Sequence, residues 1–88
     1  MKSEINQHFL DAYRKLSPEV RELARASYRR FRENPNHPGL YFKRLQGTDL
    51  YSVRIGIAHR ALGTMTGDTM TWFWIGSHAE YDKLVGFA

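Results

Sequence analysis

A turn-rich stretch in the middle of the chain, Asn34-Pro35-Asn36-His37-Pro38-Gly39, separates two halves that differ in hydrophobic periodicity. Before it, apolar residues recur every three or four positions, which is typical of helices that bury one face. After it, apolar and polar residues alternate or form short apolar runs, which is typical of strands. Helices followed by a run of strands indicate an α+β fold.

The first half predicts two consecutive helices that form a hairpin. A single apolar face runs along residues 3–16 and consists of Ile5, Phe9, Ala12, Tyr13 and Leu16. Ser17 and Pro18 favour a second helix start, because serine caps free backbone N–H groups and proline suits the first helical position. The stripe that then continues to the turn-rich stretch consists of Val20, Leu23, Ala24, Ser27, Tyr28 and Phe31.

The second half predicts a four-stranded sheet and a short final helix. The strands are expected at residues 41–45, 50–57, 59–65 and 69–75, and the helix at residues 78–85. Strict alternation along residues 50–57 places one set of side chains on the core face: Tyr51, Val53, Ile55 and Ile57. Trp72-Phe73-Trp74-Ile75 is apolar on both faces, which is typical of a central strand covered on both sides.

The length and composition exclude several classes of protein. With 88 residues, the chain fits one domain, residues 1–88, and has no room for separate cofactor-binding and substrate domains. It contains no cysteine, which excludes a Cys-based zinc site and suits a reducing compartment. No apolar run approaches the roughly 20 residues that a membrane-spanning helix needs. We therefore expect a cytoplasmic protein with no membrane partner.

The positive charge is concentrated in the first half of the chain. Residues 1–44 contain ten Lys or Arg against five acidic residues, whereas the net charge of the whole chain is +4. A basic strip lies on the outer face of the second predicted helix, where four arginines are about one turn apart: Arg21, Arg25, Arg29 and Arg32. Like charges at this spacing repel each other weakly. The basic strip is either a solvated face or a docking surface for phosphates or an acidic chain.

Several polar residues of the predicted sheet and final helix could converge on one surface. Arg54 projects from the strand face opposite the core residues, and a hairpin brings Arg60 of the next strand near it. Two neighbouring guanidiniums favour an anion between them, and their bidentate geometry suits phosphate. The flanking candidates are Lys43, Arg44, His78 and Tyr81. Each residue alone also fits a plain role at the surface or in an ion pair.

The sequence shows no pattern for a metal or cofactor site. His37, His59 and His78 do not have metal-ligand spacing, and no paired carboxylates support them. A phosphate-binding glycine-rich loop and a G-x-S-x-G motif are also missing. We expect chemistry without a metal or a cofactor.

Three segments carry a resemblance to a known family. NPNHPGLYFKRLQG, LYSVRIGIAHRALG and WFWIGSHAEYDKL, in this order, resemble the RelE/ParE superfamily of bacterial type II toxin–antitoxin toxins. The resemblance extends over essentially the whole chain. It implies an N-terminal helical hairpin packed on a curved, mainly antiparallel four-stranded sheet, followed by a short C-terminal helix. It also implies a cognate antitoxin that wraps the toxin and neutralises it.

The resemblance implies specific roles for the candidate residues. Toxins of the nuclease branch cleave mRNA in the ribosomal A site without a metal. By motif, their catalytic residues correspond to Arg54, Arg60, His78 and Tyr81 of this chain. The auxiliary RNA contacts are Lys43 and Arg44, joined by the basic strip of Arg21, Arg25, Arg29 and Arg32 if it docks on RNA.

The chain departs from the nuclease pattern at two places. Ser52 stands where some members have a further lysine, and Ala58-His59 precedes Arg60 where an aromatic residue is more usual. We expect a ribosome-associated mRNA endonuclease. The alternative is a ParE-like inhibitor of DNA gyrase without nuclease activity, since that branch shares the fold. A third interpretation is a regulatory module that works only in complex with its antitoxin.

Overall fold

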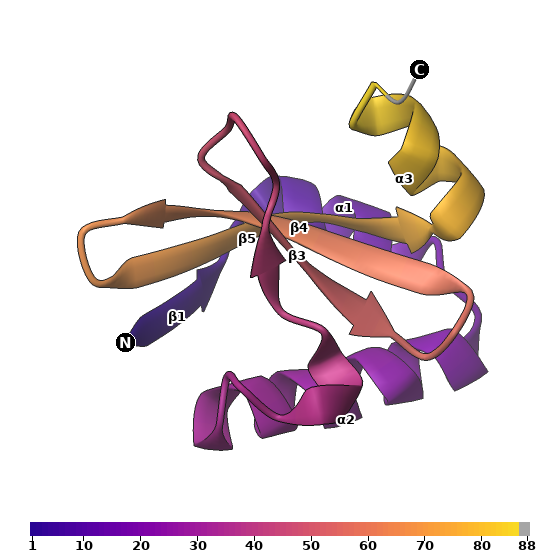
Figure 1. The fold of residues 1–88 in the computed structure, drawn as a ribbon. Helices are drawn as coiled ribbons and strands as arrows, with labels where there is room; N and C mark the ends of the chain where they lie inside the picture. The colour runs from indigo at the N-terminus through magenta and orange to yellow at the C-terminus, as the bar shows by residue number, and fades with distance from the viewer. Residues whose placement is uncertain (87–88) are drawn as a thin grey trace.

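The computed structural model describes residues 1–86 and contains one five-stranded sheet in the order β1-β5-β4-β3-β2 (Figure 1). The strands are β1 (Lys2–Ile5), β2 (Lys43–Arg44), β3 (Leu50–Ile55), β4 (His59–Thr66) and β5 (Thr69–Ser77). The helices are α1 (Gln7–Arg14), α2 (Pro18–Glu33) and α3 (His78–Leu84), with a single 3-10 turn, η1 (Pro38–Leu40). The predicted α+β fold, with two N-terminal helices and a short C-terminal helix, is confirmed.

The prediction of a four-stranded sheet is wrong, because the first residues of the chain form a fifth strand. β1 pairs in parallel with β5, with Ser3 opposite Met70, so the sheet is mixed, and its other three strand pairs make it mainly antiparallel, as expected. Asn6 ends this strand and caps α1, since its side chain accepts a hydrogen bond from the backbone N–H of Phe9 at 3.0 Å. The expected helix over residues 3–16 is therefore shortened to Gln7–Arg14.

β2 and β3 are both shorter than the strands expected from the sequence. Only Lys43–Arg44 of the expected strand 41–45 pairs with β3. β3 ends at Ile55, and the residues that follow form a turn in which Ile57 is 89% exposed. Ile57 therefore does not belong to the core face, because the chain turns before the alternation reaches it.

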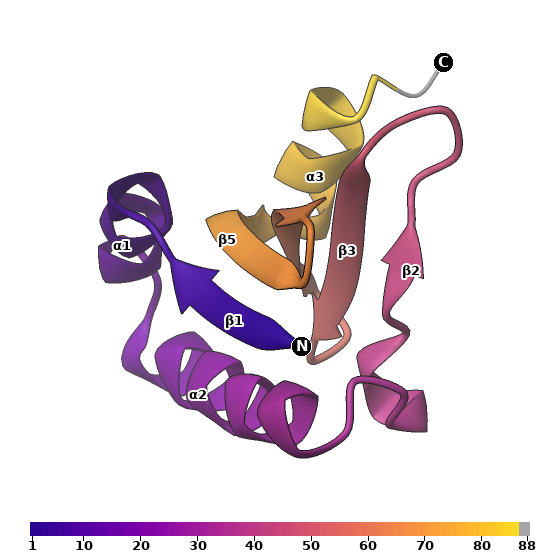
Figure 2. The ribbon, with the colours of Figure 1, turned by 90° about the vertical axis from the view of Figure 1, so that its left-hand side faces the viewer.

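One face of the sheet packs on α2 and forms the core. Figure 2 shows α2 on one side of the sheet and α3 on the other. Phe31 of α2 packs edge-on against Trp72 of β5, with ring centroids 5.2 Å apart. The strand side chains buried with it are Val53, Ile55, Ala61, Met70, Trp72 and Ile75. The predicted helix stripe is only partly correct, since Leu23 is 47% exposed.

A β-bulge lets β5 present apolar side chains to both faces. In the β4–β5 register Leu62 lies opposite Trp74 and Gly63 opposite Trp72, so the pairing passes over Phe73. The bulge shifts the alternation of side chains between the two faces of β5 by one residue. Trp72 and Ile75, three positions apart, therefore both point into the core. β5 lies between β1 and β4, as expected for a strand that is apolar on both faces.

Candidate functional site

Arg54 and Arg60 lie directly opposite each other in the antiparallel pair of β3 and β4. The neighbouring pair, Val53 and Ala61, is buried in the core beneath α2. Because successive side chains of a strand point to opposite faces, both arginines project from the face away from α2. Directly opposed strand residues have Cβ atoms only about 4.5–5.5 Å apart. The predicted approach of the two arginines is therefore present in the strand register.

The two arginines line a depression of about 360 Å³ on this face. The sequence-predicted residues that meet there are Lys43, Arg54, Arg60, His78 and Tyr81. Ser52 forms part of the wall and is only 3% exposed. The depression thus brings together four basic side chains that were expected to converge, and the phenol of Tyr81 lies beside them: Lys43, Arg54, Arg60 and His78.

Each guanidinium at the depression has an intramolecular anchor. The Cζ atom of Arg54 lies 4.0 Å from the ring centroid of Tyr41. Arg60 donates a hydrogen bond of 2.8 Å to the backbone carbonyl of His59. Burial, and then the nearby charge of Arg54, lower the pKa of the Arg60 guanidinium from its ordinary value. An anion between the two side chains would relieve this repulsion, which is the electrostatic condition for a phosphate site.

The start of α3 fixes His78 beside the arginines. The backbone N–H of His78 donates to the carbonyl of Ala58 at 2.8 Å, which ties the helix to the β3–β4 turn. Ser77 and Glu80 form a capping box, in which each side chain accepts a backbone hydrogen bond from the other residue. Nε2 of His78 lies 3.4 Å from a carboxylate oxygen of Asp82, one turn along the helix. The imidazole therefore has a partner that orients it when it is protonated.

Tyr81 has a different environment from His78. Tyr81 is buried, with 6% of its surface exposed, whereas about half of the His78 side chain is open to solvent. The two ring centroids are 6.3 Å apart. His78 is thus accessible to a ligand that enters the depression, and Tyr81 forms part of its wall.

Replacing Glu80 by alanine is expected to lower the melting temperature by a few degrees at neutral pH, because α3 loses half of its capping box. Hydrogen bonds from the Ser77 backbone and hydroxyl lower the pKa of the Glu80 carboxyl. A lowered pKa in the folded state stabilises the protein above the unfolded pKa, and this stabilisation disappears as the pH falls through the folded value.

Thermal unfolding of both proteins across the acidic range checks this expectation. The difference between wild type and Glu80→Ala should be largest near neutrality and should vanish at the acidic end. Lys83→Ala, on an exposed position of the same helix, is the matched control and should show no such pH dependence. A difference that stays constant down to the acidic end would contradict the role of the carboxylate.

The structure places the other predicted basic residues outside the depression. The side chain of Arg44 donates a hydrogen bond of 2.7 Å to the Thr48 carbonyl and lies 3.7 Å from a carboxylate oxygen of Asp49. Arg44 therefore stabilises the turn between β2 and β3. The basic strip lies on α2, and Figure 2 shows α2 across the sheet from α3, whose residues His78 and Tyr81 line the depression. The strip and the depression are therefore two separate basic surfaces.

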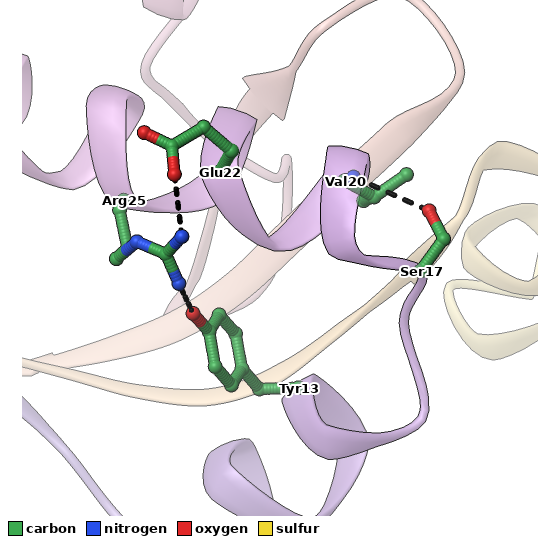
Figure 3. Close-up of polar contacts among 5 residues, drawn as sticks. All are labelled: Tyr13, Ser17, Val20, Glu22 and Arg25. Atoms are coloured by element: carbon green, nitrogen blue, oxygen red, sulfur yellow. Dashed lines mark hydrogen bonds and ion pairs between the residues drawn. The ribbon is translucent and has the colours of Figure 1, made fainter.

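Two members of the basic strip are already engaged within the chain. Arg25 donates hydrogen bonds to Glu22 and to the Tyr13 hydroxyl, which joins α2 to α1 (Figure 3). The Cζ atom of Arg32 lies over the ring of Tyr28, 5.9 Å from its centroid. Within residues 1–86, Arg21 and Arg29 form no ion pair. These two arginines have the charge that is most available to a partner.

Sequence reasoning missed two residues that line the depression, Tyr41 and Asp82. The signal for Asp82 was available, because it follows His78 by four positions on a predicted helix and such pairs share one face. Tyr41 gave no such signal. It was expected within a regular strand, whereas its backbone is left-handed, with φ 48°.

Residues 1–86 contain neither a cluster of metal-ligating side chains nor a membrane-spanning helix. No group of three or more His, Cys, Asp or Glu side chains is placed to hold a metal ion within these residues. No helix in the same part of the chain is long and apolar enough to cross a membrane.

Comparison with known proteins gives one family match and several structural matches. The sequence profile of the ParE-like toxin domain matches residues 18–83. No curated protein sequence matches the chain.

The fold is similar to solved toxins of low sequence identity. A chain of the RelB–RelE antitoxin–toxin complex from Methanococcus jannaschii matches with a TM-score of 0.72 and 15% identity, covering 93% of this chain and 98% of that chain. The YoeB/ParE toxin from Agrobacterium tumefaciens matches with a TM-score of 0.68 and 18% identity, covering 89% and 99%. The isolated RelE toxin of E. coli matches with a TM-score of 0.64 and 18% identity, covering 97% and 98%.

Proposed function

The chain belongs to the ParE-like toxin family of the RelE/ParE superfamily, and we propose that it cleaves mRNA on the ribosome without a metal and so stops translation. The observation that carries this proposal is the pair of opposed arginines, Arg54 and Arg60, in a depression that His78 also lines. A paired guanidinium site beside an exposed imidazole suits a phosphodiester better than it suits a protein surface.

The proposed reaction is an attack of the 2′-hydroxyl of RNA on the adjacent phosphate. A bond forms between O2′ and phosphorus, and the bond between phosphorus and the 5′-oxygen of the next nucleotide breaks. The products are a 2′,3′-cyclic phosphate and a free 5′-hydroxyl. The step needs a base for the 2′-hydroxyl proton, an acid for the leaving 5′-oxygen and positive charge for the phosphorane.

The residues of the depression supply each of these requirements. Arg54 and Arg60 stabilise the charge that develops on the phosphorane oxygens. His78 exchanges the proton with the reacting oxygens, and Asp82 orients its imidazole. Tyr81, which is buried in the wall, supports the position of His78. Lys43 adds a contact to the RNA backbone at the β2 side.

We propose one partner besides the ribosome and its mRNA, a cognate antitoxin, since a RelB antitoxin accompanies the matching toxin chain from Methanococcus jannaschii. On the ribosome itself, the basic strip across the sheet from the depression would bind ribosomal RNA. Two basic surfaces on opposite sides would let the protein dock on the ribosome while the mRNA enters the site.

Replacing both Arg21 and Arg29 by glutamine is expected to weaken ribosome binding and to flatten its dependence on salt. If each arginine neutralises one phosphate, the slope of log affinity against log salt should fall by roughly 1.4 to 1.8. Binding to purified ribosomes, measured at several salt concentrations, gives this slope. The control is Glu19→Gln, at an exposed position of the same helix that forms no ion pair within residues 1–86, and its slope should not fall. An unchanged slope in the double variant would make the strip a solvated face.

The test of the proposed function is cleavage of mRNA on programmed ribosomes by the purified protein. We expect cleavage in the presence of EDTA, with 2′,3′-cyclic phosphate ends. In cells, induction without an antitoxin should stop protein synthesis before DNA synthesis, measured by pulse labelling. Intact mRNA at a large excess of toxin would contradict the proposal.

The second candidate function is inhibition of DNA gyrase without nuclease activity. It is favoured by the family profile, which is that of the ParE-like toxin domain, and by the buried Ser52, which stands where some nuclease members have a lysine. A supercoiling assay separates the two candidates. Gyrase activity that is unchanged by a large molar excess of the protein excludes this alternative.

A further inference from the structure

Tyr41 combines three properties that a residue of purely structural importance does not need. It is the only non-glycine residue with positive φ within residues 1–86, with φ 48° and ψ 44°. It is 57% exposed although it is a large aromatic residue. It also lines the same depression as Arg54 and His78.

The left-handed backbone of Tyr41 is costly and would suit another residue better. Glycine and asparagine adopt this conformation readily, whereas a bulky side chain is strained there. Such strain is held where the surrounding structure enforces it, often at functional sites. Here Leu40 on one side is 1% exposed, and Phe42 on the other packs against Phe31 with ring centroids 5.0 Å apart. These two anchors force the ring of Tyr41 to the other side of the chain, away from the core.

One face of the ring has a cationic partner. The guanidinium of Arg54 lies over it with its Cζ atom 4.0 Å from the ring centroid, which is a cation–π contact. Because Arg54 covers this face, the 57% of Tyr41 that is exposed has to come mainly from the opposite face and the edges. The structure therefore presents a flat, open aromatic surface immediately beside an arginine of the phosphate site.

We propose that Tyr41 is a stacking platform for one nucleobase of the RNA, next to the phosphate that Arg54 binds. The inference rests on the proposed nuclease function and adds a residue that positions the nucleotide in the same site. Stacking needs only a π face and accepts every base, so the platform favours purines modestly through their larger area and does not read a sequence. Tyr41 would thus place the nucleotide rather than take part in proton transfer.

The test compares four short oligonucleotides that cannot be cleaved. One is a trinucleotide with 2′-O-methyl riboses, and the other three each carry an abasic residue in place of one of its nucleobases. For wild type we expect the full trinucleotide to bind about 5- to 150-fold more tightly than one of its abasic forms, from the strength of base–aromatic stacking. NMR titration or fluorescence anisotropy measures the four affinities.

Three variants of the same position separate stacking from folding. Tyr41→Phe keeps the ring and should keep the preference for the full trinucleotide. Tyr41→Asn and Tyr41→Gly lose the ring but accept the left-handed backbone, so they should fold like wild type and bind that abasic form and the full trinucleotide almost equally. Circular dichroism and thermal unfolding verify the fold of each variant.

The outcomes distinguish this inference from the proposed function. If Tyr41→Asn still prefers the full trinucleotide to the abasic form as strongly as wild type does, Tyr41 is not a stacking platform, even if wild type cleaves mRNA on ribosomes. A preference that disappears in Tyr41→Asn supports the platform even if no cleavage is found. Wild type that binds all the oligonucleotides equally, or none of them, also overturns it, because an open stacking surface must favour a base.

Discussion

Replacing Arg60 by alanine is expected to reduce the rate of mRNA cleavage on the ribosome by about 100- to 1,000-fold. Removing one preorganised charge that stabilises a transition state costs about 2.7–4 kcal/mol in activation free energy. Arg60 holds such a position, since it lies opposite Arg54 and its guanidinium is fixed by the carbonyl of His59. Single-turnover cleavage of mRNA on programmed ribosomes measures the loss directly.

Two further variants show whether charge or geometry is responsible. Arg60→Lys keeps the charge but lacks the planar fork, so it should recover only part of the rate. Arg30→Ala removes an exposed arginine of α2, across the sheet, and should cleave like wild type. Because Arg60 is half-buried, its loss should leave the protein folded, which circular dichroism can verify. Full activity in a folded Arg60→Ala protein would remove Arg60 from the catalytic site.

The approach of the two arginines was predictable from local sequence, but their exact pairing was not. Alternation along residues 50–55 assigns Arg54 to the face away from the core, and a hairpin brings the next strand beside it. The expected strand end at Ile57, instead of Ile55, did not give the register that places Arg54 opposite Arg60. The position of His78 was predictable for a similar reason, because it begins a helix directly after a strand. These features depend on contacts between neighbouring elements of the chain, which periodicity and turn signals describe well.

The first strand and the conformation of Tyr41 were not predictable in this way. β1 forms because Lys2–Ile5 pairs with a strand more than sixty residues later, and no local pattern reports that contact. Ile5 lies at a helical spacing from Phe9, which made a longer helix look consistent. Tyr41 turns out of the core only because Leu40 and Phe42 are both held by packing from elsewhere.

The same limit applies to the core stripe of α2. Leu23 and Phe31 fit the helical period equally well, yet Leu23 is 47% exposed and Phe31 is 3% exposed. Periodicity identifies the side of a helix that faces the sheet but does not show how far the sheet extends beneath it. The aromatic cluster around Phe31, formed with Phe42 and Trp72, shows where the sheet covers the helix.

Replacing Phe31 by alanine is therefore expected to lower the free energy of unfolding by about 3–5 kcal/mol, through lost burial and the cavity that remains. A chain of 88 residues has a total stability of about 4–13 kcal/mol, so this variant loses a large share of it. Urea denaturation should show a much lower midpoint with an unchanged slope. The loss includes two edge-to-face contacts, with Phe42 and Trp72.

Leu23→Ala is the matched control, because it removes an apolar side chain from the same helix stripe. Since Leu23 is already about half exposed, its loss should cost less than about 1 kcal/mol. Equal losses in the two variants would mean that α2 does not sit on the sheet as described. The contrast also bears on the site, because Phe31 supports Phe42 and Phe42 holds the segment that presents Tyr41. A folded fraction of Phe31→Ala should therefore show weaker discrimination against the abasic oligonucleotide, whereas Leu23→Ala should discriminate like wild type.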